Sequence, residues 1–244
     1  MRHAILHFDI LPSTSDFLKN NYHDYFDGIV VVAKEQTAGH GRKGRRWLDN
    51  GKSLLFSILL KDKRIEKFQS LIPLIAGASL EEALFKMGVK VTIKWPNDIY
   101  IGDKKVAGII SESIQDNNFE ALVIGIGINV DNDDFPSYLP NPTSLYLETN
   151  KHFNKDDLLR AFLDAFDDLL TKQFNGENAF YPIIKEHDYL KGKKIVLNYY
   201  NENRHVEALG IAPDGAYEVK NEDGTITKVT SGEVNIDKSS LLKE

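Results

Sequence analysis

Apolar runs separated by turn sequences recur through the first 130 residues of the chain. β-Branched and other apolar side chains dominate these runs, which is typical of buried strands. Around Gly102 and Asp103 the chain changes from apolar to polar and back, as it does in a hairpin. The pattern predicts strands over residues 28–33, 53–60, 89–93, 99–101, 106–110 and 121–130.

Helical spacing of apolar residues marks two longer segments. Residues 68–87 repeat apolar positions every three to four residues, and Gly88 provides a C-terminal cap. Residues 155–170 carry a narrower apolar stripe, with Asn154 as the N-cap. Near the N-terminus, the hydroxyl residues at 13–15 precede a short segment of mixed polarity, so we also expect a helix start there.

After about Leu190 the pattern changes to short strands separated by turns. The turn sequences at 213–215 and 222–224 place glycine where a positive φ is needed. Short strands are predicted over residues 195–197, 206–211, 217–219 and 225–229. We therefore predict an α+β fold, with strands and packed helices over 1–189 and a small β-barrel module over 190–244.

Composition limits the class of protein. The chain has 244 residues, of which 42% are hydrophobic, enough to fill a sizeable core. It contains no cysteine, which excludes a disulfide scaffold and cysteine-based zinc or nucleophile chemistry. The sequence shows no secretory signal pattern and no apolar run of about 20 residues, so we expect a cytoplasmic protein without a membrane partner.

Residues 36–47 carry the strongest chemical signal. The formal net charge of the chain is −6, yet this segment contains four permanent cations and three glycines. Glycine lets the backbone approach a phosphate closely, and guanidinium groups bond the oxygens of phosphate or carboxylate. The segment predicts an anion site, although a solvated run of charges explains residues 42–46 equally well when they are taken alone.

Two further clusters lie at strand ends. Residues 94–98 form a turn built on proline, but a lysine and a tryptophan beside a carboxylate favour a functional site over a turn alone. Lys105 stands where the chain enters an apolar strand, and the small residues Ala107 and Gly108 leave room for a ligand. Asn129 follows the last apolar run and is either a polar contact in the same cleft or a turn residue.

The sequence does not match the motifs of several other kinds of site. The seven histidines show no metal-ligand pattern, and no Gly-x-Ser-x-Gly elbow is present. Gly125 and Gly127 lack the third glycine of a dinucleotide fingerprint, and residues 39–46 do not match the phosphate loop of P-loop enzymes. We expect no metal held by dedicated protein ligands, and any nucleotide to be held by an unusual loop.

Taken together, these clusters resemble the biotin protein ligases, and the likeness covers nearly the whole chain. The matching motifs are the Ser13–Thr14 pair, Gln36, the Gly-x-Gly-Arg-x-Gly-Arg-x-Trp loop at 39–47, and the segments 94–98, 105–108 and 125–129. The resemblance implies a catalytic domain like that of class II synthetases, with a mixed central sheet and packed helices. It also implies an SH3-like β-barrel as the C-terminal domain, to which residues 231–234 are similar.

The resemblance implies a two-step ligation that uses ATP. The biotin carboxylate attacks the α-phosphate of Mg²⁺-bound ATP to give biotinyl-5′-AMP and pyrophosphate. The biotinyl group then passes to a lysine of a biotin carboxyl carrier protein, such as the one in acetyl-CoA carboxylase. Because a carboxylate and a triphosphate repel each other, such a site needs several cations where negative charge gathers.

A role for each matched residue is also implied by the resemblance. Catalytic roles are expected for Lys105, Arg42, Arg45 and Asp98, with Asp98 orienting or deprotonating the incoming amine. Biotin contacts are expected from Ser13, Thr14, Ser15, Gln36, His40, Gly41, Arg42, Trp47, Lys105 and Gly108. ATP contacts are expected from Arg42, Lys43, Arg45, Lys94, Asn97, Asp98, Lys105 and Asn129.

Two residues depart from the family's usual pattern. His40 stands where the family usually has Arg, and Ser15 stands where Asn is common. Family members that also act as repressors carry an N-terminal helix-turn-helix, and the Ser13–Thr14 pair begins too early here to leave room for one. We therefore expect a ligase without a nucleic-acid partner, and either a monomer or a homodimer.

Two other functions compete with this one. A lipoate ligase or octanoyltransferase resembles the biotin ligases in catalytic fold, but the arginine-glycine loop and the β-rich tail favour biotin. A small RNA-binding protein would use the cations of residues 42–46 for the backbone and Trp47 for base stacking. The RNA-binding alternative leaves residues 94–98 without an explanation.

Overall fold

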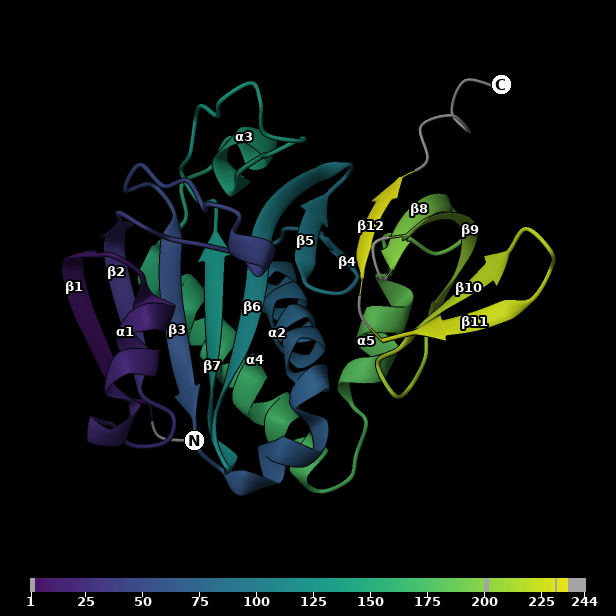
Figure 1. Ribbon diagram of the computed structural model, residues 1–244. Coiled ribbons are helices and arrows are strands. Elements are labelled where there is room, and N and C mark those ends of the chain that lie inside the picture. The colour runs from purple at the N-terminus through teal and green to yellow at the C-terminus, as the bar shows by residue number, and fades with distance from the viewer. Residues whose placement is uncertain (1–2, 200–201, 231, 237–244) are drawn as a thin grey trace.

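The computed structural model describes residues 3–199, 202–230 and 232–236. Its main feature is a seven-stranded sheet with the strand order β1-β2-β3-β7-β6-β5-β4 (Figure 1). β1 pairs with β2 in parallel and the other neighbours are antiparallel, which confirms the predicted mixed sheet. Its strands are β1 (Ile5–Leu11), β2 (Val30–Gln36), β3 (Leu54–Leu60), β4 (Thr92–Lys94), β5 (Asp98–Ile101), β6 (Lys104–Asp116) and β7 (Asn118–Ile128).

Helices cover both faces of this sheet (Figure 1). The covering helices are α1 (Thr14–Asn21), α2 (Ile72–Lys86) and α4 (Lys155–Phe174). On one face, Leu18 of α1 packs with Val31 of β2 in a small core. On the other face, α2 and α4 enclose the larger core, in which the rings of Phe56 and Phe162 lie 5.3 Å apart. Burial on both faces explains why β3 is apolar along nearly its whole length.

The helix predicted over 68–87 begins later than the apolar pattern indicated. A 3₁₀ segment, η3 (Lys63–Leu71), precedes α2, and Phe68 within it has a non-helical φ of −142°. Pro73 lies in the first turn of α2, where its missing N–H is tolerated, whereas an interior proline would break the helix. The prediction was therefore wrong for residues 68–71 and right for the helix that follows.

Other local predictions are confirmed. The Asn154 side chain accepts hydrogen bonds from the N–H groups of Asp156 and Asp157, so it is the N-cap of α4. The Ser13 side chain accepts from the N–H of Asp16 and caps α1 in the same way. The hairpin of β5 and β6 turns at Gly102, whose φ is 55°.

Some elements were not predicted. The edge strand β1 and the short helices α3 (Leu145–Thr149) and α5 (Phe180–Glu186) lack a strong apolar period. β4 covers only residues 92–94, which pair with residues 98–100, so the strand predicted over 89–93 begins three residues later than expected. Two further 3₁₀ turns are η1 (Tyr22–Asp24) and η2 (Arg42–Gly44). No helix in the described ranges is both long and apolar enough to cross a bilayer.

A second, antiparallel sheet follows, with the strand order β11-β10-β9-β8-β12. Its strands are β8 (Lys194–Tyr199), β9 (Glu202–Ile211), β10 (Tyr217–Asn221), β11 (Ile226–Val229) and β12 (Glu233–Ile236). The first four confirm the predicted β-rich tail, whereas β12 was not predicted, and Ser231 lies outside the described residues. We call this unit the C-terminal sheet; it lies beyond β4, at one edge of the main sheet (Figure 1). The domain boundary at residue 190 stays a prediction.

Candidate active site

A cavity of about 530 Å³ brings the three predicted clusters together. The predicted site residues that line it are Ser13, Thr14, Ser15, Gln36, His40, Gly41, Arg42, Arg45, Trp47, Lys94, Asn97, Asp98, Lys105, Gly108 and Asn129. Lys43 was predicted to contact ATP but is not part of this lining. It lies exposed in the turn of η2, with a φ of 57°. Its contact with ATP stays a prediction.

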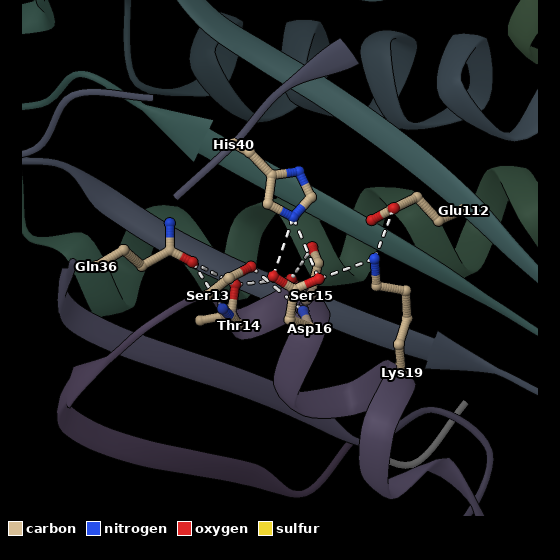
Figure 2. A network of polar contacts seen from close by, with 9 residues as sticks. Ser13, Thr14, Ser15, Asp16, Lys19, Gln36, His40 and Glu112 are labelled. Atoms are coloured by element: carbon tan, nitrogen blue, oxygen red, sulfur yellow. Dashed lines mark hydrogen bonds and ion pairs between the residues drawn. The ribbon is translucent and has the colours of Figure 1, made fainter. Parts of the chain in front are cut away.

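Hydroxyl and amide groups of several cavity-lining residues belong to one polar network (Figure 2). The Gln36 side-chain oxygen accepts hydrogen bonds from the Thr14 N–H, at 2.6 Å, and from the Thr14 hydroxyl, at 3.1 Å. The buried Ser57 hydroxyl on β3 lies 2.7 Å from the Thr14 hydroxyl and 2.9 Å from the Ser15 hydroxyl. This network orients groups that both donate and accept, as recognition of a neutral polar ring requires.

Ser57 was not among the predicted site residues. The signal that would have found it is a lone hydroxyl in the apolar strand β3. The position of Ser15 beside Ser57 also explains one of the two glycines in β7, because a Cβ on Gly125 would overlap the Ser15 Oγ. Ser15, where Asn is common in the resembling family, thus faces Ser57 and packs tightly against the backbone of β7.

The basic loop, residues 39–47, folds back on itself as a short hairpin. The Gly41 N–H donates to the Arg45 carbonyl at 2.7 Å, and the Trp47 N–H donates to the Gly39 carbonyl at 2.8 Å. Between these two bonds, η2 makes the turn and carries Lys43 at its positive φ. The hairpin presents Arg42 and Arg45 to the cavity.

The Trp47 indole closes the base of this loop against two glycines. A Cβ on Gly127 of β7 would lie 2.7 Å from the Trp47 ring, and one on Gly108 of β6 would lie 3.1 Å from it. The two glycines are paired across the strands. The sequence predicted that something approaches the 121–130 strand closely, and the indole does so. Its N–H is buried and has no hydrogen-bond partner among the described residues.

Lys105 lies beside the loop as a positioned cation. Its ammonium is 2.7 Å from an Asp98 carboxylate oxygen and 5.8 Å from the centre of the Trp47 ring. Two backbone hydrogen bonds fix its main chain, one to the Asn141 carbonyl at 2.8 Å and one from the Thr143 N–H at 2.9 Å. An ammonium held in this way can attract a carboxylate or phosphate without reorganising.

Residues 94–98 form the turn between β4 and β5, as predicted. The Asn97 amide donates to the Ile109 carbonyl at 2.8 Å, and its oxygen accepts from the Arg42 guanidinium at 3.1 Å. The basic loop and the turn are therefore tied together. Lys94 donates to the Tyr100 hydroxyl at 3.3 Å, and burial, with the nearby Asp98 charge, raises the pKa of Tyr100 well above its usual range.

Asn129 is buried, lines the same cavity and donates to the Thr143 carbonyl at 2.8 Å. The loop that follows supplies apolar lining that the sequence analysis missed. These residues are Phe135, Tyr138, Leu139, Pro140 and Pro142, joined by Gly232 and Val234 from the C-terminal sheet. Aromatic and proline residues in a long loop directly after a buried strand were the available signal.

A chain of ion pairs connects the basic loop to the helix below it (Figure 2). The His40 Nε2 lies 3.1 Å from an Asp16 carboxylate oxygen. The Lys19 ammonium lies 2.8 Å from Asp16 and 2.6 Å from Glu112 on β6. Burial alone would raise the pKa of Asp16, but hydrogen bonds from Lys19 and His40 hold it below its usual range.

No group of three or more histidine and acidic residues suited to a metal ion occurs among the residues that the structure describes. The polar groups of the cavity are instead hydroxyls, amides and cations, with Asp98 paired to Lys105. This set suits a ligand with a neutral polar part and a strongly negative part.

Comparison with known proteins gives consistent relatives. Residues 7–129 match the profile of the Biotin/lipoate A/B protein ligase family. The bifunctional ligase/repressor BirA of Bacillus subtilis is 30% identical over 248 residues, which cover 96% of this chain and 74% of that protein. The biotin–[acetyl-CoA-carboxylase] ligase of Paracoccus denitrificans is 30% identical over 144 residues, which cover 56% of this chain and 60% of that protein.

Comparison with solved structures gives relatives of the same kind as the sequence comparison. The biotin protein ligase from Aquifex aeolicus, in complex with biotin and ATP, is 30% identical and superposes with a TM-score of 0.85 over 96% of this chain and 98% of that chain. A point mutant of the Aquifex aeolicus ligase in complex with biotin gives a TM-score of 0.84 at 29% identity, over 96% of this chain and 97% of that one. Fold, profile and sequence identity lead to one conclusion: the chain belongs to the Biotin/lipoate A/B protein ligase family.

Proposed function

We propose that this protein activates biotin with ATP to biotinyl-5′-AMP and transfers the biotinyl group to a lysine of a carrier protein. The observation that carries the proposal is the composition of one cavity. It combines a network of hydroxyl and amide groups with several cations. A biotin ring needs the first set, and a carboxylate meeting a triphosphate needs the second.

Two groups of cavity-lining residues would have separate roles. Ser13, Thr14, Ser15 and Gln36 would bond the ureido ring of biotin, with the backbone at His40 and Gly41 adding contacts. Lys105 would hold the carboxylate near the cations of the basic loop, because its ammonium is already placed beside Trp47 and Asp98. Arg42 and Arg45 would hold the phosphates, and Lys94, Asn97 and Asn129 would line the nucleotide side.

In the first step, a biotin carboxylate oxygen bonds to the α-phosphorus of ATP and pyrophosphate leaves. Mg²⁺ would enter with the ATP. In the second step, the lysine amine of the carrier bonds to the acyl carbon, AMP leaves with the electron pair of the C–O bond, and the amine loses a proton. Asp98 is the carboxylate paired with Lys105 at the proposed reaction centre and would orient the incoming amine or accept its proton.

The carrier is proposed to be a biotin carboxyl carrier protein, like that of acetyl-CoA carboxylase, because a relative is named for that substrate. Incubation with ATP and either biotin or lipoate separates the enzyme alternatives. We expect pyrophosphate release and an adenylate with biotin, and biotinylation of a purified carrier domain when it is added. An adenylate formed with lipoate alone would overturn the substrate assignment.

We propose that the protein does not act on nucleic acid. Of the cations at 42–46 that DNA or RNA would use, Arg42, Arg45 and Arg46 line the cavity, whereas Lys43 does not. A specific DNA footprint from the purified protein would contradict the absence of repressor function. Salt-sensitive RNA binding without adenylate formation would revive the RNA-binding alternative.

A further inference from the structure

Trp95 connects the C-terminal sheet to the candidate active site. Its side chain is only 2% exposed, and it lines the 530 Å³ cavity. Its indole N–H donates to the Gly215 carbonyl at 3.1 Å, and its ring lies 5.6 Å from the ring of Tyr217. Both partners belong to the C-terminal sheet or its turn, so this side chain is held from outside the main sheet.

The segment that connects the two sheets reinforces the contact between Trp95 and the C-terminal sheet. The fully buried Tyr217 donates its hydroxyl to the Asp188 carboxylate at 2.8 Å. Asp188 in turn lies beside Ile93 of β4, with which it forms a parallel β-bridge. Tyr189 adds a backbone hydrogen bond to the Ile93 carbonyl at 3.0 Å. Strand β4, which leads into Trp95, is therefore held along its outer edge by residues that lead into the C-terminal sheet.

The turn that accepts the indole N–H is itself docked on the main domain. Gly215 has a φ of 80°, and a Cβ there would overlap a methyl group of Leu71 and lie 3.2 Å from one of Leu74. The neighbouring Pro213 carbonyl accepts a hydrogen bond from Asn178 at 3.0 Å. The close approach requires glycine at this position, whereas a positive φ alone occurs at several turns of the chain.

We propose that Trp95 is a positioning residue, through which the C-terminal sheet holds the 94–98 turn in the geometry that adenylate formation needs. Two residues after Trp95, Asn97 accepts from Arg42; one residue later, Asp98 pairs with Lys105. A shift of the indole therefore moves the partners of both cations. This inference rests on the proposed function, because it assigns a role in that reaction.

The chain offers a matched pair of variants for the test. Gly215 and Gly224 both lie in turns of the C-terminal sheet, with φ of 80° and 85°. A Cβ at Gly224 meets nothing within 4 Å, whereas a Cβ at Gly215 meets Leu71 and Leu74. Gly215→Ala and Gly224→Ala thus add the same backbone strain, but only the first pushes the turn away from the main domain.

The experiment measures pyrophosphate release and biotin binding in these variants and in Trp95→Phe, which keeps a ring but removes the N–H donor. We expect kcat for pyrophosphate release to fall about five- to tenfold in Gly215→Ala and Trp95→Phe relative to Gly224→Ala, as loss of one hydrogen bond implies. The Kd of biotin alone should change less than kcat does, because the hydroxyl network is bonded to Gln36 and Ser57 and not to the 94–98 turn.

A spectroscopic readout distinguishes positioning from general destabilisation. The chain has two tryptophans, so the indole ¹H–¹⁵N spectrum contains two signals, which Trp47→Phe assigns. Gly215→Ala should shift the Trp95 signal and Gly224→Ala should not. Equal kcat in the two glycine variants, or a Trp95 signal that does not respond, overturns the inference. If the unmodified protein forms no biotinyl adenylate, the proposed function itself has failed instead.

Discussion

At the scale of single residues, charge placement distinguishes neighbours that look alike in sequence. Lys104 and Lys105 are adjacent, but Lys104 pairs with Glu148 outside the cavity, whereas Lys105 lines it beside Asp98. Two backbone hydrogen bonds to residues 141 and 143 fix the main chain of Lys105. Sequence pattern identified Lys105 correctly as a cavity residue because it precedes small residues in an apolar strand.

Lys105→Ala should lower biotin-dependent pyrophosphate release by about 100-fold or more, since a preorganised charge at a developing negative centre contributes on this order. The measurement is single-turnover pyrophosphate release with saturating ATP. Lys104→Ala is the matched control and should stay within about twofold of the unmodified protein. Equal activity in both variants would remove Lys105 from the proposed mechanism.

The pair of His40 and Asp16 ties the basic loop to α1, and Asp16 is stabilised as a carboxylate by both His40 and Lys19. Asp16→Asn should release the loop and accelerate biotin dissociation about two- to fivefold, as expected for a partly exposed ion pair. Stopped-flow dissociation of biotin is the measurement. Asp9→Asn, which removes an exposed pair with Lys34 outside the cavity lining, should have no effect. Identical rates for the two variants would show that the pair does not hold the loop.

At the scale of elements, the paired strands β6 and β7 form the surface against which Trp47 of the basic loop packs. Gly108 and Gly127 lie opposite each other, and the Trp47 indole covers both. Glycine is needed here for close approach and not for backbone conformation, since neither residue is among those with positive φ.

Gly127→Ala should therefore displace Trp47 and the loop while leaving the sheet intact. A misfit of this kind costs about 1–3 kcal/mol, which corresponds to roughly a 5- to 150-fold rise in the KM of biotin. Steady-state pyrophosphate release gives the KM, and circular dichroism checks the fold. Gly77→Ala on α2, where a Cβ meets neighbours only at 3.6 Å or more, serves as the control. An unchanged KM in Gly127→Ala would mean that the seating of Trp47 has no part in binding.

Elements with strong local signals were predictable, and those held by distant partners were not. The α4 helix has a capping Asn154 and a regular apolar stripe, so its pattern was sufficient. The edge strand β1 has mixed exposure and exists through pairing with β2, and β12 exists through pairing with β8. The start of α2 was misplaced because the apolar period continues through Phe68, while Pro73 sets the boundary.

At the scale of the whole molecule, the start of the chain is fastened to α4 by a partly buried ion pair. His3 donates to the Gly28 carbonyl and lies 2.9 Å from Asp167. Burial alone would lower the pKa of His3, but the hydrogen bond to Asp167 raises it above its usual value. Burial would raise the pKa of Asp167, but the hydrogen bond from His3 lowers it.

The pair should make stability depend on pH in a defined window. Because the pKa of His3 is raised, the stability that protonated His3 contributes is complete below about pH 6.5 and is lost as pH rises through the folded-state pKa. Because the pKa of Asp167 is lowered, the stability that ionised Asp167 contributes is present above about pH 4 and is lost as pH falls through the folded-state pKa. His3→Gln should cost about 1 kcal/mol of unfolding free energy at pH 5.5 and less at pH 9. Urea unfolding at both values measures this. His7→Gln, at an exposed position on β1, is the control; the same loss at both pH values for His3→Gln would contradict the charge argument.

Local pattern was enough to predict most strands of the main sheet, the two main helices, the β-rich tail and the chemical character of the site. Each depends on periodicity, capping and residue types that hold wherever the segment lies. Three further facts required the folded chain: Ser57 completes the hydroxyl network, Lys43 lies outside the cavity, and Trp95 contacts the Gly215 turn. These facts depend on contacts between residues far apart in the chain, which strand register and packing fix and local pattern does not encode.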